Sequence, residues 1–211
     1  MHKDLILVGK QGSGKGTQAK IIAKKFGFKI FETGGALRAI AAEDSDLGRE
    51  VLAITSRGDL VSNDIVMKIV EDFLSNLSSE TPVIFDGIPR SEVQRETLEA
   101  LLAQKSRDFT ALEIKLSNDE ALQRLMIRAS CNECGNNFGS EEDLCPKCGS
   151  EDVSRRNDDN PDAIMNRLKN FDEYTLPLLE EWAEVEKLVS VNGEQDIKDV
   201  SAEIFAALGI V

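Results

Sequence analysis

Short apolar runs alternate with longer amphipathic segments along most of the chain. Apolar runs of this length are typical of buried strands, whereas apolar residues repeated every three or four positions are typical of helices packed on a sheet. The pattern predicts strands at residues 5–8, 28–31, 83–85, 111–116 and 188–191. Strands that alternate with helices indicate a mostly parallel sheet with helices on both faces, which is an α/β fold.

The helical pattern covers most of the remaining chain. In residues 15–26, for example, Ala19, Ile22 and Phe26 fall on one face. The other expected helices are 33–42, 48–56, 63–74, 92–103, 119–129, 161–171, 175–187 and 197–208. Residues 131–157 break the pattern, because they contain many small and charged residues, little periodicity and all four cysteines. We interpret them as an inserted module.

Composition and charge narrow the class of protein. The chain has 211 residues, enough for one domain or two small ones. Its net charge of −13 makes it a poor binder of nucleic acid or of anionic membranes. No stretch approaches the ~20 apolar residues of a membrane span, and the first strand begins close to Met1, which leaves no room for a signal peptide. We therefore expect a cytoplasmic protein, in which disulfides are rare.

The loop after the first expected strand has the sequence Gly-Lys-Gln-Gly-Ser-Gly-Lys-Gly-Thr at residues 9–17. A Gly-rich loop with a late Lys, between a strand and a helix, is the pattern of a phosphate-binding P-loop. Its backbone N–H groups turn toward phosphate, and the helix N-terminus adds positive potential. Lys15 would reach the β- and γ-phosphates of a nucleotide. Asp86, at the end of the apolar run 83–85, is typical of the acid that supports Mg²⁺ in P-loop enzymes.

Several arginines lie near the ends of expected elements, and the guanidinium group suits bidentate binding of phosphate. Arg124 and Arg128 are four residues apart, so we expect them on one helix face. The arginines placed in this way are Arg38, Arg90, Arg124, Arg128, Arg156 and Arg167. They are candidates for neutralising phosphate charge.

The four cysteines occur in two copies of Cys-x2-Cys-Gly, separated by ten residues: Cys131, Cys134, Cys145 and Cys148. This spacing is typical of a structural Zn²⁺ site, whose four thiolates leave no open position for a catalytic water. The Gly of each copy allows a turn with positive φ. Iron–sulfur ligation, disulfides and unmetallated thiols are the alternatives. Because the module has little apolar content, metal binding would supply its folding free energy.

The order of these motifs resembles that of adenylate kinases over essentially the whole chain. The family's P-loop reads Gly-x-Pro-Gly-x-Gly-Lys-Gly-Thr, and Gln11 here replaces the Pro. Further matching stretches lie at residues 33–38, 58–61, 86–90, 156–159, 167–168, 175–178 and 191–193. Two residues of the acceptor region depart from the family: Gly35 stands where Asp is usual, and Glu32 where Ser is common. Selection of AMP over other monophosphates is therefore left open.

The resemblance implies a P-loop kinase fold of three layers (αβα), with a five-stranded parallel sheet, inserted helices that bind the nucleoside monophosphate (NMP) and a zinc-ribbon-like lid. The implied domains are a core of residues 1–31, 62–126 and 159–211, an NMP-binding domain of residues 32–61 and a lid of residues 127–158. It also implies a monomer that catalyses ATP + AMP ⇌ 2 ADP with Mg²⁺. That reaction serves adenine nucleotide homeostasis and nucleotide salvage.

Residue roles follow from the same resemblance. The implied ATP-binding residues are Gly12, Ser13, Gly14, Lys15, Gly16, Thr17, Arg124, Arg128, Asn137, Phe138 and Gln195. The implied AMP-binding residues are Thr33, Arg38, Asp59, Leu60, Val61, Gly87, Ile88, Pro89, Arg90, Gln94, Arg156 and Arg167. The implied catalytic residues are Lys15, Arg90, Arg124, Arg128, Arg156 and Arg167. Asp86 would hold Mg²⁺ through water. Phe138 has a second interpretation, as a cover for the zinc turn, and Asp158 and Asp159 are either a lock for the closed lid or a solvated turn.

The chemistry of such a transfer needs no general base. A nucleoside monophosphate is mostly a dianion at neutral pH, because its second pKa is ~6. Catalysis then depends on positioning and charge stabilisation, which agrees with a chain whose only histidine is His2.

Two other functions remain open. One is a kinase for UMP, CMP or GMP, although the long lid and Gln94 favour adenine. The other is a P-loop NTPase switch whose zinc ribbon binds nucleic acid or protein. The net charge of −13 and the acidic residues of the ribbon argue against nucleic acid.

Overall fold

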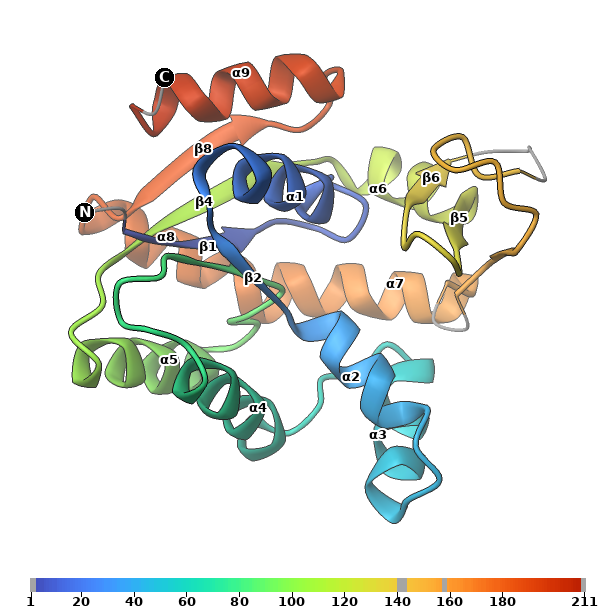
Figure 1. Cartoon of the computed structure of the whole chain (residues 1–211), viewed down its shortest axis with the longest axis horizontal. Helices are drawn as coiled ribbons and strands as arrows, with labels where there is room; N and C mark the ends of the chain where they lie inside the picture. The colour runs from blue at the N-terminus through green and yellow to red at the C-terminus, as the bar shows by residue number, and fades with distance from the viewer. Residues whose placement is uncertain (1–2, 140–143, 157–158, 210–211) are drawn as a thin grey trace.

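A parallel sheet of five strands forms the centre of the molecule (Figure 1). The computed structural model describes residues 3–139, 144–156 and 159–209. The strands follow the order β2-β3-β1-β4-β8. Their bounds are β1 (Asp4–Val8), β2 (Lys29–Glu32), β3 (Val83–Asp86), β4 (Phe109–Lys115) and β8 (Leu188–Asn192). These are the five strands that the apolar runs predicted, and the α/β class is confirmed.

Helices cover both faces of this sheet (Figure 1). On one face, Ile22 and Ile204 pack against Leu112 of the sheet; on the other, Leu98 and Trp182 pack with Phe85. The five covering helices are α1 (Lys15–Phe26), α4 (Asn63–Ser75), α5 (Glu92–Gln104), α8 (Leu176–Glu184) and α9 (Ile197–Ala207). Burial of these apolar faces, at roughly 25 cal/mol per Å², is the main favourable term in folding. No helix within the described ranges is long and apolar enough to cross a membrane.

The carboxyl ends of β1, β2 and β3 meet at one edge of the sheet. Leu7 of β1 and Glu32 of β2 both pair in register with Asp86 of β3. The P-loop therefore leaves β1 beside Asp86. The helices α2 (Thr33–Ala41) and α3 (Asp46–Ser56) project from the same edge (Figure 1). Ligands of open α/β sheets bind at this end of the strands.

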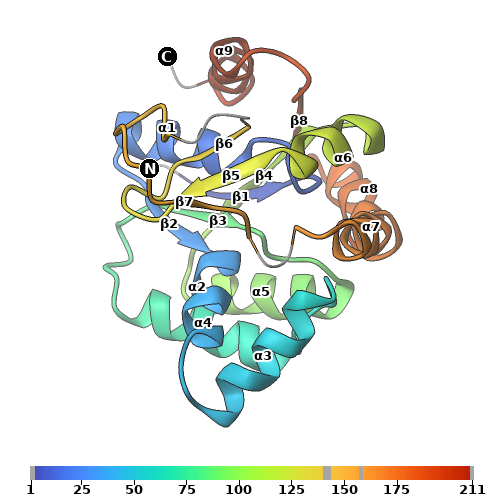
Figure 2. The ribbon, with the colours of Figure 1, turned by 90° about the vertical axis from the view of Figure 1, so that its right-hand side faces the viewer.

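The lid contains a small antiparallel sheet that the sequence did not reveal (Figure 2). Its strands are β5 (Arg128–Cys131), β6 (Asn137–Gly139) and β7 (Val153–Ser154), in the order β6-β5-β7. The preceding helix α6 (Asn118–Met126) ends before it, so the expected helix 119–129 is wrong at its end. Arg128 pairs with Gly139 across the lid sheet, and Arg124 and Arg128 do not share a helix face. Pairing with distant residues outweighs local helical periodicity here.

The two helices expected at 161–171 and 175–187 form one continuous segment. α7 (Pro161–Asn170) passes through a π-helical turn, η1 (Phe171–Thr175), into α8. The N–H of Leu176 donates to the carbonyl of Phe171, five residues earlier. Pro177, which lacks an N–H and crowds the carbonyl four residues before it, explains the wider turn.

Candidate active site and metal centre

Lys15 is the first residue of α1 and points back into the P-loop. Its Nζ donates to the carbonyl oxygens of Gly9 at 2.7 Å and Lys10 at 2.9 Å. Gly12 and Gly14 have φ of 87° and 93°, a left-handed conformation that glycine adopts at little cost. Burial lowers the pKa of Lys15 from 10.5 to about 8, against the opposing charge of Asp86. The loop thus holds a cation whose charge a phosphate would stabilise.

Asp86 lies directly behind the P-loop. Its Oδ2 is 3.4 Å from the position that a Cβ at residue 16 would occupy, so the carboxylate lies against the start of α1. Burial raises the pKa of Asp86, Lys15 opposes this rise, and the negative charge of Glu32 adds to it. A buried carboxylate beside a phosphate loop is suited to the water shell of Mg²⁺, which keeps several waters and takes one or two carboxylates. The residues present therefore fit this cation.

A cavity joins the P-loop to the acceptor side of the site. It brings together six of the expected site residues from four parts of the chain: Lys15, Leu60, Gly87, Pro89, Arg90 and Arg167. Gln11, the residue that replaces Pro in the loop, also lines it. The Oε1 atom of Gln11 is buried without a hydrogen-bond partner in the described part of the chain. A phosphate between Lys15 and Arg90 would contact both the P-loop and the loop between β3 and α5.

Arg90 is held by several bonds in this cavity. Its Nε donates to the carbonyl of Gly87 at 2.9 Å. Gln94 is buried, and its Oε1 accepts the backbone N–H of Arg90 at 2.9 Å. The hydroxyl of Thr175 donates to the carbonyl of Arg90. Gln94 therefore shapes the loop that carries Arg90.

Other expected acceptor-site residues divide between the site and the core. Thr33 is buried, and its hydroxyl has no partner within the residues described; it lies beside Gly87. Arg38 binds Glu32. Val61 and Ile88 are 6% and 1% exposed and belong to the apolar core, so their side chains serve packing.

Two asparagines that sequence reasoning missed connect residues 57–59, which follow α3, to α7. The Nδ2 of Asn166 donates to Asp59 at 2.8 Å, and that of Asn170 donates to the carbonyl of Gly58 at 3.2 Å. Asp59 also accepts from Arg57, and these bonds hold its pKa below the usual value. The only signal in the sequence is the four-residue spacing of the asparagines, which places them on one helix face.

The remaining arginines come from the lid and its two connections. Arg128 of β5 and Arg167 of α7 both donate to Asp159, at 2.6 Å and 2.8 Å for the shortest contacts. Burial opposes ionisation of Asp159, but both arginines outweigh it and lower the pKa of this carboxyl. Asp159 therefore forms a buried ion-pair bridge between β5 and α7. Asp158 lies outside the described residues.

Arg124 and Arg156 have other partners. Arg124 donates to Glu120 at 2.7 Å and to the P-loop carbonyl of Gly12 at 3.4 Å. Arg156 donates to Asn137 of the lid at 3.0 Å. Arg124 thus contacts the P-loop directly, while the charge of Arg128 acts on Lys15 and that of Arg156 acts on Asp86.

Three expected ATP contacts lie at the edge of this arrangement. Asn137 binds Ser130 and Arg156. Phe138 is half-buried in β6, and both of its interpretations stay open. Gln195 is exposed and donates to the carbonyl of Asn192 at 3.0 Å. These roles remain predictions.

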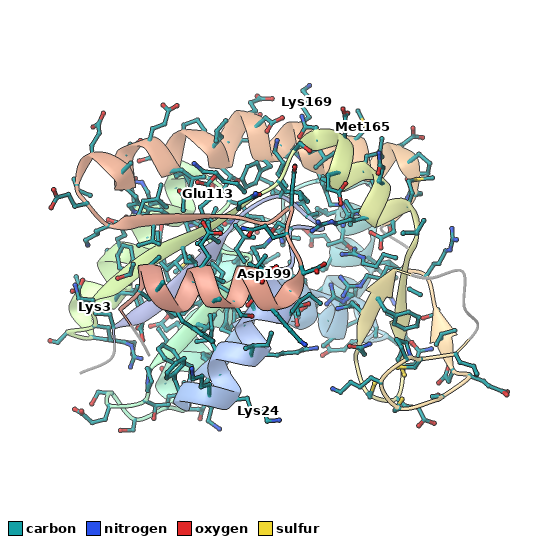
Figure 3. The ribbon with its side chains drawn as sticks, turned by 90° about the horizontal axis from the view of Figure 1, so that it is seen from above. Lys3, Lys24, Glu113, Met165, Lys169 and Asp199 are labelled. Carbon is teal, nitrogen blue, oxygen red and sulfur yellow. The ribbon has the colours of Figure 1, made fainter. Side chains whose placement is uncertain are left out.

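The four cysteines meet at one point of the lid, where Figure 3 shows sulfur atoms gathered at one end of the molecule. All four Sγ atoms lie within 4.8 Å of one another, and two pairs are 3.6 Å apart. Disulfide sulfurs are ~2.05 Å apart, whereas four thiolates at ~2.3 Å from a tetrahedral ion are about 3.8 Å apart. Gly135 and Gly149 have φ of 63° and 74°, so both turns confirm the positive φ expected. The cluster fits a zinc-binding lid.

Positively charged side chains surround a phosphate-binding loop at this site. Such an arrangement is suited to phosphoryl transfer. The protein is a P-loop phosphotransferase of the nucleoside monophosphate kinase class. The family model for adenylate kinase matches residues 7–187, and the chain belongs to that family.

Relatives of the same name align with nearly the whole chain. An adenylate kinase of Paramagnetospirillum magneticum is 36% identical over 206 residues, covering 94% of each chain. One of Allorhizobium ampelinum is also 36% identical, over 97% of this chain and 98% of its own. One of a Geobacillus species is 35% identical over 98% of both chains. The sequence similarity thus extends over nearly the full length of each chain.

Proposed function

We propose that this enzyme transfers the γ-phosphoryl group of ATP to AMP and so interconverts ATP + AMP with two ADP, serving adenine nucleotide homeostasis and salvage. The observation that carries the proposal is the cavity in which Lys15 of the donor loop and Arg90 of the acceptor segment line one space. In-line transfer requires both phosphates to be held in one place and does not require a general base.

The residues divide the work by position. Lys15 and the amides of residues 12–17 hold the ATP phosphates, while Arg38 and Arg90 hold the AMP phosphate. Asp86 would hold hydrated Mg²⁺, and the bound ion would supply positive charge that neutralises the nucleotide phosphates. Arg124, Arg128, Arg156 and Arg167 neutralise the transferring group. Arg128 and Arg167 can do this only if their guanidinium groups bind phosphate as well as Asp159.

The proposed moving parts are a core (residues 1–31, 62–126 and 159–211), an NMP-binding unit (residues 32–61) and a zinc-bound lid (residues 127–158). The start of β5 at Arg128, after α6 ends, supports the first lid boundary. Lid closure excludes water, whose attack would hydrolyse ATP. We further infer a monomeric, cytoplasmic enzyme whose partners are ATP, AMP and ADP. The net charge of −13 disfavours a nucleic-acid partner.

The second candidate function is transfer to UMP, CMP or GMP, which the unusual Glu32 and Gly35 keep open. The deciding experiment offers purified protein Mg-ATP with each of AMP, UMP, CMP and GMP and measures nucleoside diphosphates against a control without acceptor. Fast ADP formation with AMP alone supports the proposal. Faster conversion of another monophosphate moves the acceptor assignment, and hydrolysis without any acceptor contradicts a kinase.

A further inference from the structure

Glu32 and Arg38 form an ion pair at the edge of the acceptor segment. Glu32 is the last residue of β2, and Arg38 lies one and a half turns into α2. The Nη2 of Arg38 donates to Oε1 of Glu32 at 2.8 Å. The side chains are 41% and 44% exposed, and ion pairs this exposed contribute little to stability. Any contribution of the pair to the site is therefore through the orientation that it gives the guanidinium group.

Two consecutive glycines lie against this pair. A Cβ on Gly34 would lie 3.0 Å from Nη1 of Arg38, and a Cβ on Gly35 would lie 3.5 Å from the carboxylate of Glu32. Both glycines are within α2, where glycine weakens a helix relative to alanine. Neither has the positive φ that would require glycine. The guanidinium group of Arg38 therefore lies against Gly34, and the carboxylate of Glu32 lies against Gly35.

The pair also faces the reacting edge of the sheet. Glu32 and Asp86 are register partners at the carboxyl ends of β2 and β3, and the charge of Glu32 contributes to the raised pKa of Asp86. Glu32 thus stands between the acceptor arginine and the carboxylate behind the P-loop. The usual Asp of the family at position 35 is absent, and the carboxylate reaches that place from position 32.

We propose that Glu32 is a positioning residue for the acceptor nucleotide: its carboxylate holds Arg38 across Gly34 and Gly35, so that the other guanidinium N–H groups meet the acceptor's phosphate. The inference rests on the proposed function, in which Arg38 binds that phosphate. An arginine oriented in advance loses less conformational freedom when the phosphate binds. The pair should therefore strengthen acceptor binding without changing the transfer step.

The first test is Glu32→Gln, with Asp44→Asn as the matched control. Asp44 also binds an arginine of this segment, Arg49 at 2.7 Å, but its side chain is fully exposed. We expect the Kd for AMP from calorimetry, and the KM for AMP, to rise about three- to ten-fold in Glu32→Gln, the cost of one side chain ordered on binding. We expect kcat, the KM for ATP and the melting temperature to stay within about two-fold or a few degrees. An unchanged or lower KM for AMP overturns the proposal.

The second test moves the carboxylate. Glu32→Ser should weaken AMP binding as Glu32→Gln does. Gly35→Asp alone places a second carboxylate beside that of Glu32 and should also weaken AMP binding. The double variant Glu32→Ser with Gly35→Asp should restore the wild-type KM for AMP within about two-fold, because a single carboxylate is again present beside Arg38. A double variant no better than Glu32→Ser overturns the proposal. Wild-type protein that fails to phosphorylate AMP defeats the proposed function instead, so the two failures are distinct.

Discussion

Asp4 and Arg107 form a buried ion pair with two contacts across the base of the sheet. The Nε and Nη2 of Arg107 donate to the two carboxylate oxygens of Asp4 at 2.7 Å and 2.8 Å. The side chains are 3% and 7% exposed. Asp4 also accepts the backbone N–H of Val83 at 2.8 Å, and Arg107 donates to the carbonyl of Thr81 at 2.6 Å. The pair therefore ties the start of β1 to the start of β3.

We expect Arg107→Ala to lower the free energy of unfolding by about 3–5 kcal/mol, because it leaves the Asp4 carboxylate buried without its counter-ion. The double variant with Asp4→Ala should cost less than the sum of the single variants, since it removes both charges. Urea unfolding of the three variants measures these differences. Lys3→Ala is the control: its partner is Asp108, and both side chains are more than half exposed, so the change should be within about 1 kcal/mol. Equal effects of Lys3→Ala and Arg107→Ala would contradict the assignment.

The sequence indicated the strands but not this pair. Strands consist of apolar runs, and an Asp at the start of one is compatible with solvent. The partner of Asp4 is 103 residues away, and no local pattern connects them. The same holds for the lid: β5 becomes a strand because residues 137–139 and 153–154 lie beside it. What the sequence did contain was spacing, as in the cysteine turns and the P-loop, where all contributing residues are neighbours in the chain.

The four-cysteine cluster leads to a prediction on metal and lid stability. We expect about one Zn²⁺ per chain and expect Cys148→Ser to lower both zinc content and lid stability, because three thiolates bind the ion more weakly than four. Hydrogen exchange should then increase in residues 128–139 before it increases in the central sheet. Lys147→Ala, in the same turn but with no ligand atom for zinc, is the control. Iron with visible absorbance, or zinc content and exchange unchanged by Cys148→Ser, would contradict a structural zinc site.

The position of Lys15 leads to a prediction on rate. We expect Lys15→Met to reduce turnover by at least 10²- to 10³-fold, the usual effect of removing one preorganised donor from developing charge. Circular dichroism and the melting temperature should show an intact fold. Lys24→Met is the matched control, since Lys24 lies on the same helix but is exposed and near its other end (Figure 3). Comparable activity of the two variants would remove Lys15 from the proposed mechanism.

The lowered pKa of Lys15 makes nucleotide binding depend on pH. Near pH 8.5 a group with a pKa of about 8 is mostly neutral in the free protein, and bound phosphates favour its charged form. Binding of ATP should therefore be accompanied by the uptake of roughly 0.7 proton per site at pH 8.5 and of roughly 0.1 proton at pH 7. The affinity of the protein for ATP should fall as the pH rises above 8. Calorimetry in two buffers of different ionisation enthalpy measures this uptake directly.

The contribution of Lys15 to folding stability changes with pH in the opposite direction to its contribution to ATP binding. Below pH 8 both the folded and the unfolded chain carry the Lys15 charge, and the folded state bears the cost of burying it. Between pH 8 and 10.5 the unfolded chain binds more protons, so this group's contribution to stability rises with pH. Lys15→Met should abolish both the extra proton uptake on binding and this rise. Proton uptake that persists in Lys15→Met would assign the titration to another group of the site.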